Sequence, residues 1–170
     1  EEWSYYNDGP VRYGSMFQGE VYDARKEAEI KGWTTPGYED VGWNKAHEID
    51  LEGTAYLDPP EYDNYKLIGQ IGETARIIKE LCAHELTEVR PGVYIYDMGQ
   101  NMVGIPKIGL TGGTPGDTIR LRFAEVLYPD MDEYQANKGM VMLENIRAAH
   151  AQDVYILKEG ENVIQPHFTF

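Results

Sequence analysis

The sequence predicts an all-β fold, and three observations support that prediction. Residues Thr118 to Val126 alternate, with Ile119, Leu121 and Phe123 on one side and Arg120 and Arg122 among those on the other. Clusters of Gly, Pro, Asp and Asn interrupt the chain repeatedly, as turns between short strands do. The remaining apolar runs are short, as expected for strands.

The first part of the chain predicts short strands in long ordered loops. It is dense in Gly, Asp, Tyr and Trp from Trp3 to Ala46. Phe17, Gly19 and Val21 alternate there with Gln18, Glu20 and Tyr22. Residues 53–65 then gather Pro, Asp and Asn, which favour turns over strands. We place a domain boundary there, giving a first module of residues 1–64 and a second of residues 65–170.

The second part predicts a series of hairpins. Residues 74–81 and 85–89 are β-compatible, and Arg90-Pro91-Gly92 forms a turn before a strand at residues 93–96. Residues 111–116 form a turn before the strand at 118–126. The apolar runs 153–157 and 163–170 are separated by a polar turn and predict another hairpin. This part is therefore a β-sandwich candidate, although residues 139–151 have a spacing that a helix could also use.

Composition excludes several classes of function. The formal net charge is −14, and the 15 Lys and Arg residues are scattered, which argues against nucleic-acid binding. No apolar stretch approaches the length of a membrane span. Cys82 is the only cysteine, so an intrachain disulfide is impossible, and the cellular compartment stays open.

The two ends of the sequence indicate that the chain is a piece of a longer protein, since the first residue is Glu1 and the last residues lie within an apolar run. Such a piece would expose surface that normally faces the rest of the protein. Exposed apolar area drives self-association, so a homodimer is one expected consequence.

The sequence evidence for catalytic residues is weak. Asp97 and Glu125 each follow an apolar strand and are the most interesting pair of acids for glycoside hydrolysis, but strand-end acids are more often structural. The four His residues have no ligand-like spacing, and no nucleophile elbow is present.

Candidate binding residues are clearer. Tyr22, Asp23 and Arg25 fall within four residues, a group able to stack on a sugar and bond its hydroxyls. Asp23 could also ligate calcium, and an ordinary solvated Asp-Arg pair is an equal alternative. Gln100 and Asn101 lie between glycines after a strand, where they could bind hydroxyls or simply pin the turn.

These motifs resemble a known family. Gly19 to Arg25, Gly32-Trp33 and Pro36 to Trp43 resemble the N-terminal domain of bacterial α-L-rhamnosidases, glycoside hydrolase family 78. Val93 to Gly104, Gly116 to Thr118, Arg122 to Leu127 and Gln152 to Tyr155 are similar to the concanavalin-like β-domain of that family, in the same order.

The resemblance implies two β-sandwich modules of jelly-roll or concanavalin-like type, the first incomplete, upstream of an (α/α) barrel that carries the catalytic acids. It implies no catalytic residue in this chain and a parent enzyme that removes terminal α-L-rhamnose by inverting hydrolysis. The expected partners are that barrel and a rhamnose-containing carbohydrate.

The resemblance also suggests a sugar site. Some members bind rhamnose through their N-terminal domain, with calcium held by an Asp-Asn pair to which Asp23 would correspond. Ala24 replaces the Asn here, which removes an oxygen ligand and weakens the case for calcium. An accessory scaffold is therefore the first hypothesis, and a carbohydrate-binding module that uses Tyr22, Asp23, Arg25 and Trp33 is the second. Independent catalysis by Asp97 and Glu125 is the third.

Overall fold

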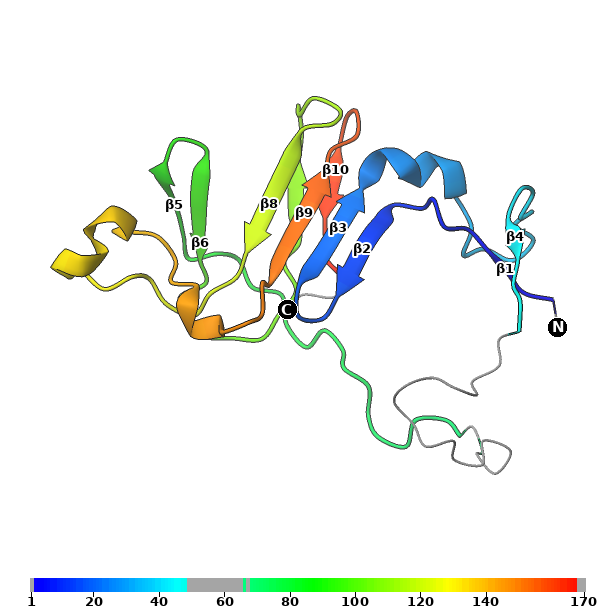
Figure 1. Ribbon diagram of the computed structural model, residues 1–170, viewed down its shortest axis with the longest axis horizontal. Coiled ribbons are helices and arrows are strands. Elements are labelled where there is room, and N and C mark those ends of the chain that lie inside the picture. Colours follow the sequence, from blue (N-terminus) through cyan, green and yellow to red (C-terminus); the bar gives the residue numbers. More distant parts are fainter. Residues whose placement is uncertain (1, 49–65, 67, 168–170) are drawn as a thin grey trace.

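The computed structural model describes residues 2–48, 66 and 68–167, and its regular elements are mostly short strands (Figure 1). The strands are β1 (Ser4–Tyr5), β2 (Val11–Ser15), β3 (Gly19–Asp23), β4 (Asn44–Lys45), β5 (Glu85–Arg90), β6 (Val93–Asp97), β7 (Ile108–Leu110), β8 (Thr118–Arg122), β9 (Gln152–Ile156) and β10 (Asn162–Ile164). The described helices are 3₁₀ turns: η1 (Ala24–Ile30), η3 (Asp132–Asn137) and η4 (Glu144–Ile146). The predicted all-β class is confirmed.

A four-stranded sheet with the order β2-β3-β9-β8 forms the centre of the fold. Strands β2 and β3 are antiparallel, β3 and β9 are parallel, and β9 and β8 are antiparallel. The parallel pair joins residues 19–23 to residues 152–156, so strands from both predicted modules share one sheet. The predicted boundary itself, at residues 53–65, lies outside the described residues, so its position stays a prediction.

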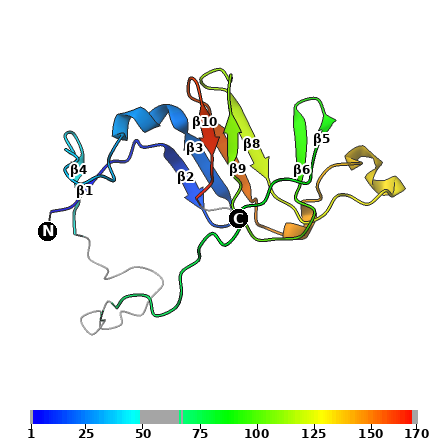
Figure 2. The same ribbon diagram turned by 180° about the vertical axis from the view of Figure 1, so that it is seen from behind.

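A second, two-stranded sheet of β10 and β7 covers one face of the central sheet, as the view from behind shows (Figure 2). The core between the two layers is small. Its buried hydrophobic members are Ala24, Tyr155, Leu157 and Ile164, and Tyr22, Ile108, Leu110, Ile119 and Leu121 pack against them. One face of β3 therefore points to this core and the other points away from it, and the candidate residues Tyr22 and Asp23 lie on this strand.

The local sequence explains the central strands well. Strand β8 alternates exposed and half-buried residues, as its pattern predicts, although it ends at Arg122 rather than at Val126. In β3 the buried side includes Glu20, which is only 3% exposed, and Tyr22 lies on the same side of the strand. The face of β3 that points to the core is thus the one that carries Glu20 and Tyr22, although these residues are more polar than Gly19 and Val21 on the other face.

The predicted hairpin of β5 and β6 is confirmed, with its turn at Pro91 and Gly92. The β-compatible stretch 74–81 forms no strand, and its isoleucines lie exposed along an extended segment. Residues 139–151 contain only the short turn η4. A strand needs a neighbour to bond with, and among the described residues none pairs with 74–81.

The predicted hairpin between residues 153–157 and 163–170 was wrong in its pairing. Both runs contain strands, but β10 pairs with β7 instead of β9. The reason is that β9 already bonds to β3 along one edge and to β8 along the other, so neither edge is open to β10. The turn between β9 and β10 is held by the buried Asn162, whose side-chain oxygen accepts from the Lys158 N–H at 2.9 Å and whose amide donates to the Lys158 carbonyl at 3.0 Å. This loop carries the chain from one layer to the other. Residues 168–170 lie outside the described residues.

Candidate functional site

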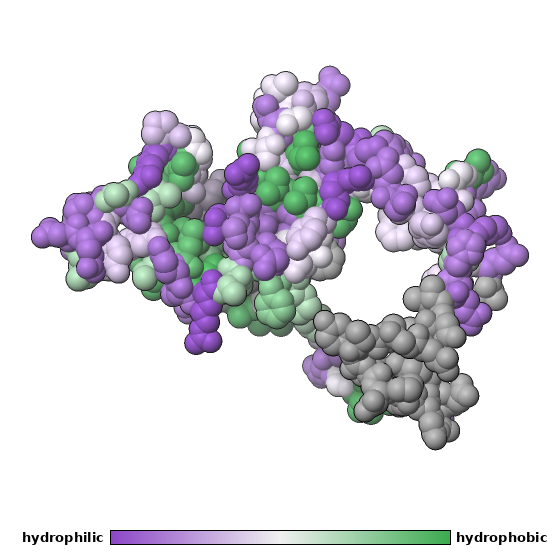
Figure 3. Space-filling view, viewed as in Figure 1, coloured by the Kyte–Doolittle hydropathy of each residue, from purple (hydrophilic) through white to green (hydrophobic). Residues whose placement is uncertain are grey.

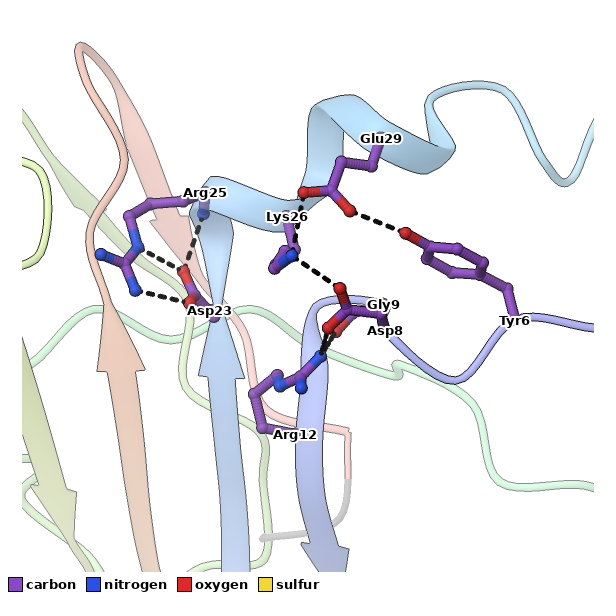
Figure 4. Close-up of polar contacts among 8 residues, drawn as sticks. All are labelled: Tyr6, Asp8, Gly9, Arg12, Asp23, Arg25, Lys26 and Glu29. Carbon is purple, nitrogen blue, oxygen red and sulfur yellow. Dashed lines mark hydrogen bonds and ion pairs between the residues drawn. The ribbon is translucent and has the colours of Figure 1, made fainter. Parts of the chain in front are cut away.

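The predicted pair of Asp23 and Arg25 forms at the end of β3 (Figure 4). The Arg25 Nε donates to Asp23 Oδ1 at 2.9 Å, and Arg25 Nη2 donates to Asp23 Oδ2 at 2.8 Å. Asp23 Oδ1 also accepts from the Arg25 backbone N–H at 3.1 Å and so caps η1. These hydrogen bonds from Arg25 lower the pKa of Asp23. The carboxylate is largely buried, whereas half of the guanidinium side chain is exposed.

Tyr22 lies on the opposite face of β3 from Asp23, because neighbouring residues of a strand point to opposite sides. Its ring stacks on Tyr155, with centroids 5.1 Å apart, and its hydroxyl donates to Glu27 at 3.0 Å. With Tyr155, Pro166 and His167 among its neighbours, it lines a cavity of about 370 Å³. Tyr22 therefore does not share a surface with the Asp23–Arg25 pair.

Trp33 follows η1 on an exposed loop, with 55% of its surface open to solvent. Its backbone N–H donates to the Ile30 carbonyl at 3.0 Å. Within the described part of the chain, no ring contact or hydrogen bond joins it to Tyr22, Asp23 or Arg25. The structure thus brings together two of the four predicted sugar-binding residues, and the role of all four stays a prediction.

Calcium does not fit the surroundings of Asp23 well. Both carboxylate oxygens already accept hydrogen bonds from Arg25, and Ala24 offers no side-chain oxygen. Calcium takes six to eight oxygen ligands. Among the described residues, no cluster of three or more His, Cys, Asp or Glu side chains is placed to hold a metal.

A charged network next to this pair is not evident from the sequence (Figure 4). The Lys26 ammonium bridges Asp8 at 2.8 Å and Glu29 at 3.0 Å. Arg12 also binds Asp8, and the Tyr6 hydroxyl donates to Glu29 at 2.7 Å. Lys26 and Arg12 lower the pKa of Asp8, and Lys26 itself has a raised pKa because of Asp8 and Glu29. Sequence spacing can predict only the pairs between residues three or four positions apart, such as Arg12 with Asp8. The longer-range contacts of the network connect η1 to the segment before β2.

Asp97 and Glu125 are both exposed. Asp97 Oδ1 accepts from the Gly99 N–H at 2.7 Å, so this acid pins the turn that follows β6. Gln100 and Asn101 are exposed on that turn. The arrangement supports a structural role for Asp97 over a catalytic one.

Two buried acids were missed by sequence reasoning. Glu20 and Asp153 are each 3% exposed, and Asp153 Oδ1 accepts from the Glu20 N–H at 2.9 Å. Glu20 Oε2 lies 2.8 Å from His167 Nδ1. These contacts join residues more than 130 positions apart, and no local signal predicts them.

The stacked tyrosines predict a loss of stability at alkaline pH. Burial and the nearby Glu27 raise the pKa of Tyr22 and bring that of Tyr155 to about 12. A raised pKa stabilises the fold fully below the unfolded value of about 10, and this stabilisation is lost as the pH rises through the folded value. We expect the urea midpoint to fall steeply above about pH 10. Urea titrations followed by tyrosinate absorbance would measure it.

The double variant Tyr22→Phe and Tyr155→Phe is the control for that measurement. It lacks both hydroxyls, so its urea midpoint should depend less steeply on alkaline pH. Reversible ionisation of both tyrosines near their ordinary pKa in the folded chain would contradict the expectation.

Comparison with known proteins identifies the chain. Residues 1–64 match the model of the α-L-rhamnosidase N-terminal domain. Residues 87–170 match that of the bacterial α-L-rhamnosidase concanavalin-like domain. The chain belongs to the bacterial α-L-rhamnosidase family. The predicted resemblance and the concanavalin-like assignment are thereby confirmed.

Related α-L-rhamnosidases are much longer than this chain. A protein from Streptomyces avermitilis named α-L-rhamnosidase is 41% identical over 95% of this chain, which covers 14% of its length. One from Formosa agariphila is 32% identical over the whole chain and 16% of its own length. The solved α-L-rhamnosidase of Dictyoglumus thermophilum has a TM-score of 0.75 and 35% identity over 95% of this chain and 16% of its own. The chain thus spans about one sixth of these relatives.

No described helix of this rhamnosidase-family chain has both the length and the apolar character that crossing a membrane requires.

Proposed function

We propose that this chain is a non-catalytic accessory region of an α-L-rhamnosidase, and that it packs on the catalytic barrel of the same enzyme. The observation that supports this most is the mismatch between a small core and a large apolar surface. Among the residues that the structure describes, four hydrophobic residues are buried, while many large hydrophobic side chains are at least one-third exposed. Burial of such surface against a partner is strongly favourable.

The exposed apolar side chains concentrate in the middle of the chain. Ile71, Ile77 and Ile78 are 90%, 77% and 96% exposed. Leu86 and Tyr94 on the hairpin β5–β6 are each 54% exposed. Hydrophobic surface also lies between this hairpin and the central sheet (Figure 3). The extended segment 68–81 and the hairpin β5–β6 lie apart in the fold (Figure 1). We propose the exposed apolar side chains of both parts, from Ile68 to Tyr96, as the docking surface for the barrel.

A hybrid enzyme tests the proposal. Replacing the matched segment of the Streptomyces avermitilis relative with this chain should give a folded enzyme that hydrolyses an aryl α-L-rhamnoside. The isolated chain should release no p-nitrophenol above the blank, because Asp97 and Glu125 are both exposed and Asp97 holds the turn after β6. Turnover by the isolated chain would contradict the proposal.

Variants within the hybrid test the docking surface. The double change Ile77→Asp and Ile78→Asp places two charges where apolar contact is proposed, so the hybrid should melt at a lower temperature. Val41→Asp is the matched control, since Val41 is 86% exposed outside the docking surface. Equal melting temperatures for the two variants would argue against docking. Dimerisation of the isolated chain through the docking surface would be consistent with the proposal, because the barrel that is proposed to bury this surface is then absent.

A second candidate function is carbohydrate binding by the predicted residues Tyr22, Asp23, Arg25 and Trp33, of which Tyr22 lies on the other face of β3 from Asp23. The half-exposed Arg25 guanidinium and the exposed Trp33 ring favour it, since both are groups that contact sugars. Calorimetry with L-rhamnose, with and without calcium, separates the two candidates. Heat of binding that Arg25→Ala abolishes would support a binding module.

A further inference from the structure

A cleft of about 420 Å³ opens near the start of β3. Its lining comes from three adjacent strands and the segments that flank them: Tyr13, Gln18, Glu20, Val21, His150, Gln152 and Val154. Val21 and Val154 are register partners, so their side chains share one face of the sheet. Volumes of this size accommodate small ligands.

Four polar side chains around the cleft have no partner within the described part of the chain. The Tyr13 hydroxyl, the Gln18 and Gln152 amides and the His150 ring make no hydrogen bond there. Tyr13 is 50% exposed, and Gln18 and His150 are exposed as well. The cleft therefore combines an apolar floor with several donors and acceptors that are unused.

The backbone that presents these groups is held in an uncommon conformation. Ala151 has a φ of 42°, which few residues other than glycine adopt. Its N–H donates to the Phe17 carbonyl at 3.1 Å, and the Gln152 N–H donates to the Gln18 carbonyl at 3.2 Å. These two bonds fasten the loop that carries His150 to the turn between β2 and β3. Such strained positions cluster at binding sites.

We infer that this cleft binds a neutral sugar ring. No Lys or Arg lines it, and the Glu20 side chain lies on the opposite face of β3 against His167, so neither an anion nor a free cation is favoured. Amides and an imidazole suit hydroxyl groups, while Tyr13 and the two valines suit the C–H faces of a sugar. From β3 the cleft is lined by Glu20 and Val21, whereas neither Asp23 nor Arg25 lines it. It is therefore separate from the Asp23–Arg25 pair.

This inference is independent of the docking proposal, because the cleft lies outside the docking surface. Its test is a titration of the ¹⁵N-labelled 170-residue chain with L-rhamnose, followed by amide chemical shifts. We expect saturable shifts at Gln18, Ala151 and Gln152. Tyr13→Ala and Gln18→Ala should each weaken binding by about tenfold or more, since each removes one recognition element.

Matched variants keep the result interpretable. Tyr5→Ala removes a tyrosine of similar exposure, 46% against 50% for Tyr13, from β1, outside both the cleft and the docking surface, and should leave the affinity unchanged. The amide spectrum of each variant reports whether the fold persists. Absence of any shift would overturn the inference. Shifts confined to Asp23, Arg25 and Trp33, or affinity that is insensitive to Tyr13 and Gln18, would overturn it as well.

Discussion

Gly19→Ala should cost the chain at least about 3 kcal/mol, enough to unfold much of the population. Gly19 has a φ of 97°, and a Cβ at this position would lie 2.1 Å from the carbonyl oxygen of Gln152. The clashing atom belongs to the backbone of β9, so it cannot rotate away as a side chain could. Relief requires separating β3 from β9, the parallel pair at the centre of the main sheet. Urea unfolding followed by circular dichroism would measure the loss.

Gly160→Ala is the matched control for this substitution. Gly160 has a similar φ of 81°, but a Cβ there would meet nothing within 4 Å. Its cost should be about 1–2 kcal/mol, the usual penalty of a left-handed backbone for L-residues. The difference between the two variants therefore isolates the steric effect of the β3–β9 contact. Equal losses would show that the strands can separate at that point without penalty.

Ile164→Ala should cost about 2–5 kcal/mol. Ile164 is 1% exposed and belongs to β10, the strand that covers the core face of the central sheet. Truncation leaves a cavity next to Tyr155 and Leu157, and a core of this size has few other residues to fill it. Thermal unfolding monitored by calorimetry would give the change.

Val163→Ala, one residue earlier, is the control for the core substitution. Val163 is 52% exposed on the other side of the same strand. Its loss should stay within about 0.5 kcal/mol, as for most surface changes. A similar cost at both positions would mean that β10 does not close the core in solution.

Local strand signals were predicted well from the sequence. The alternation around Ile119 and Leu121, and the Pro-Gly turn between β5 and β6, depend on neighbours in the chain and appear where expected. The extended run at 74–81 shows the limit of such signals. Its β-forming residues have no partner strand among the described residues, and so no ladder forms.

The candidate site was predicted only in part. Asp23 and Arg25 meet because they lie two residues apart at a helix start, a geometry that sequence can indicate. Tyr22 turns away because strand geometry alternates, and Trp33 lies on a loop whose path no local rule determines. The buried Glu20 contacts His167, which lies 147 positions away in the chain.

By itself, the sequence determined the β class and the family, since these depend on residue types and short-range order. Only the tertiary structure decided that β3 joins β9, that β10 crosses to β7, and that an acid lies in the core. Those outcomes depend on pairing between distant segments. Hydrogen bonding and steric fit select that pairing among many arrangements that the same local preferences allow.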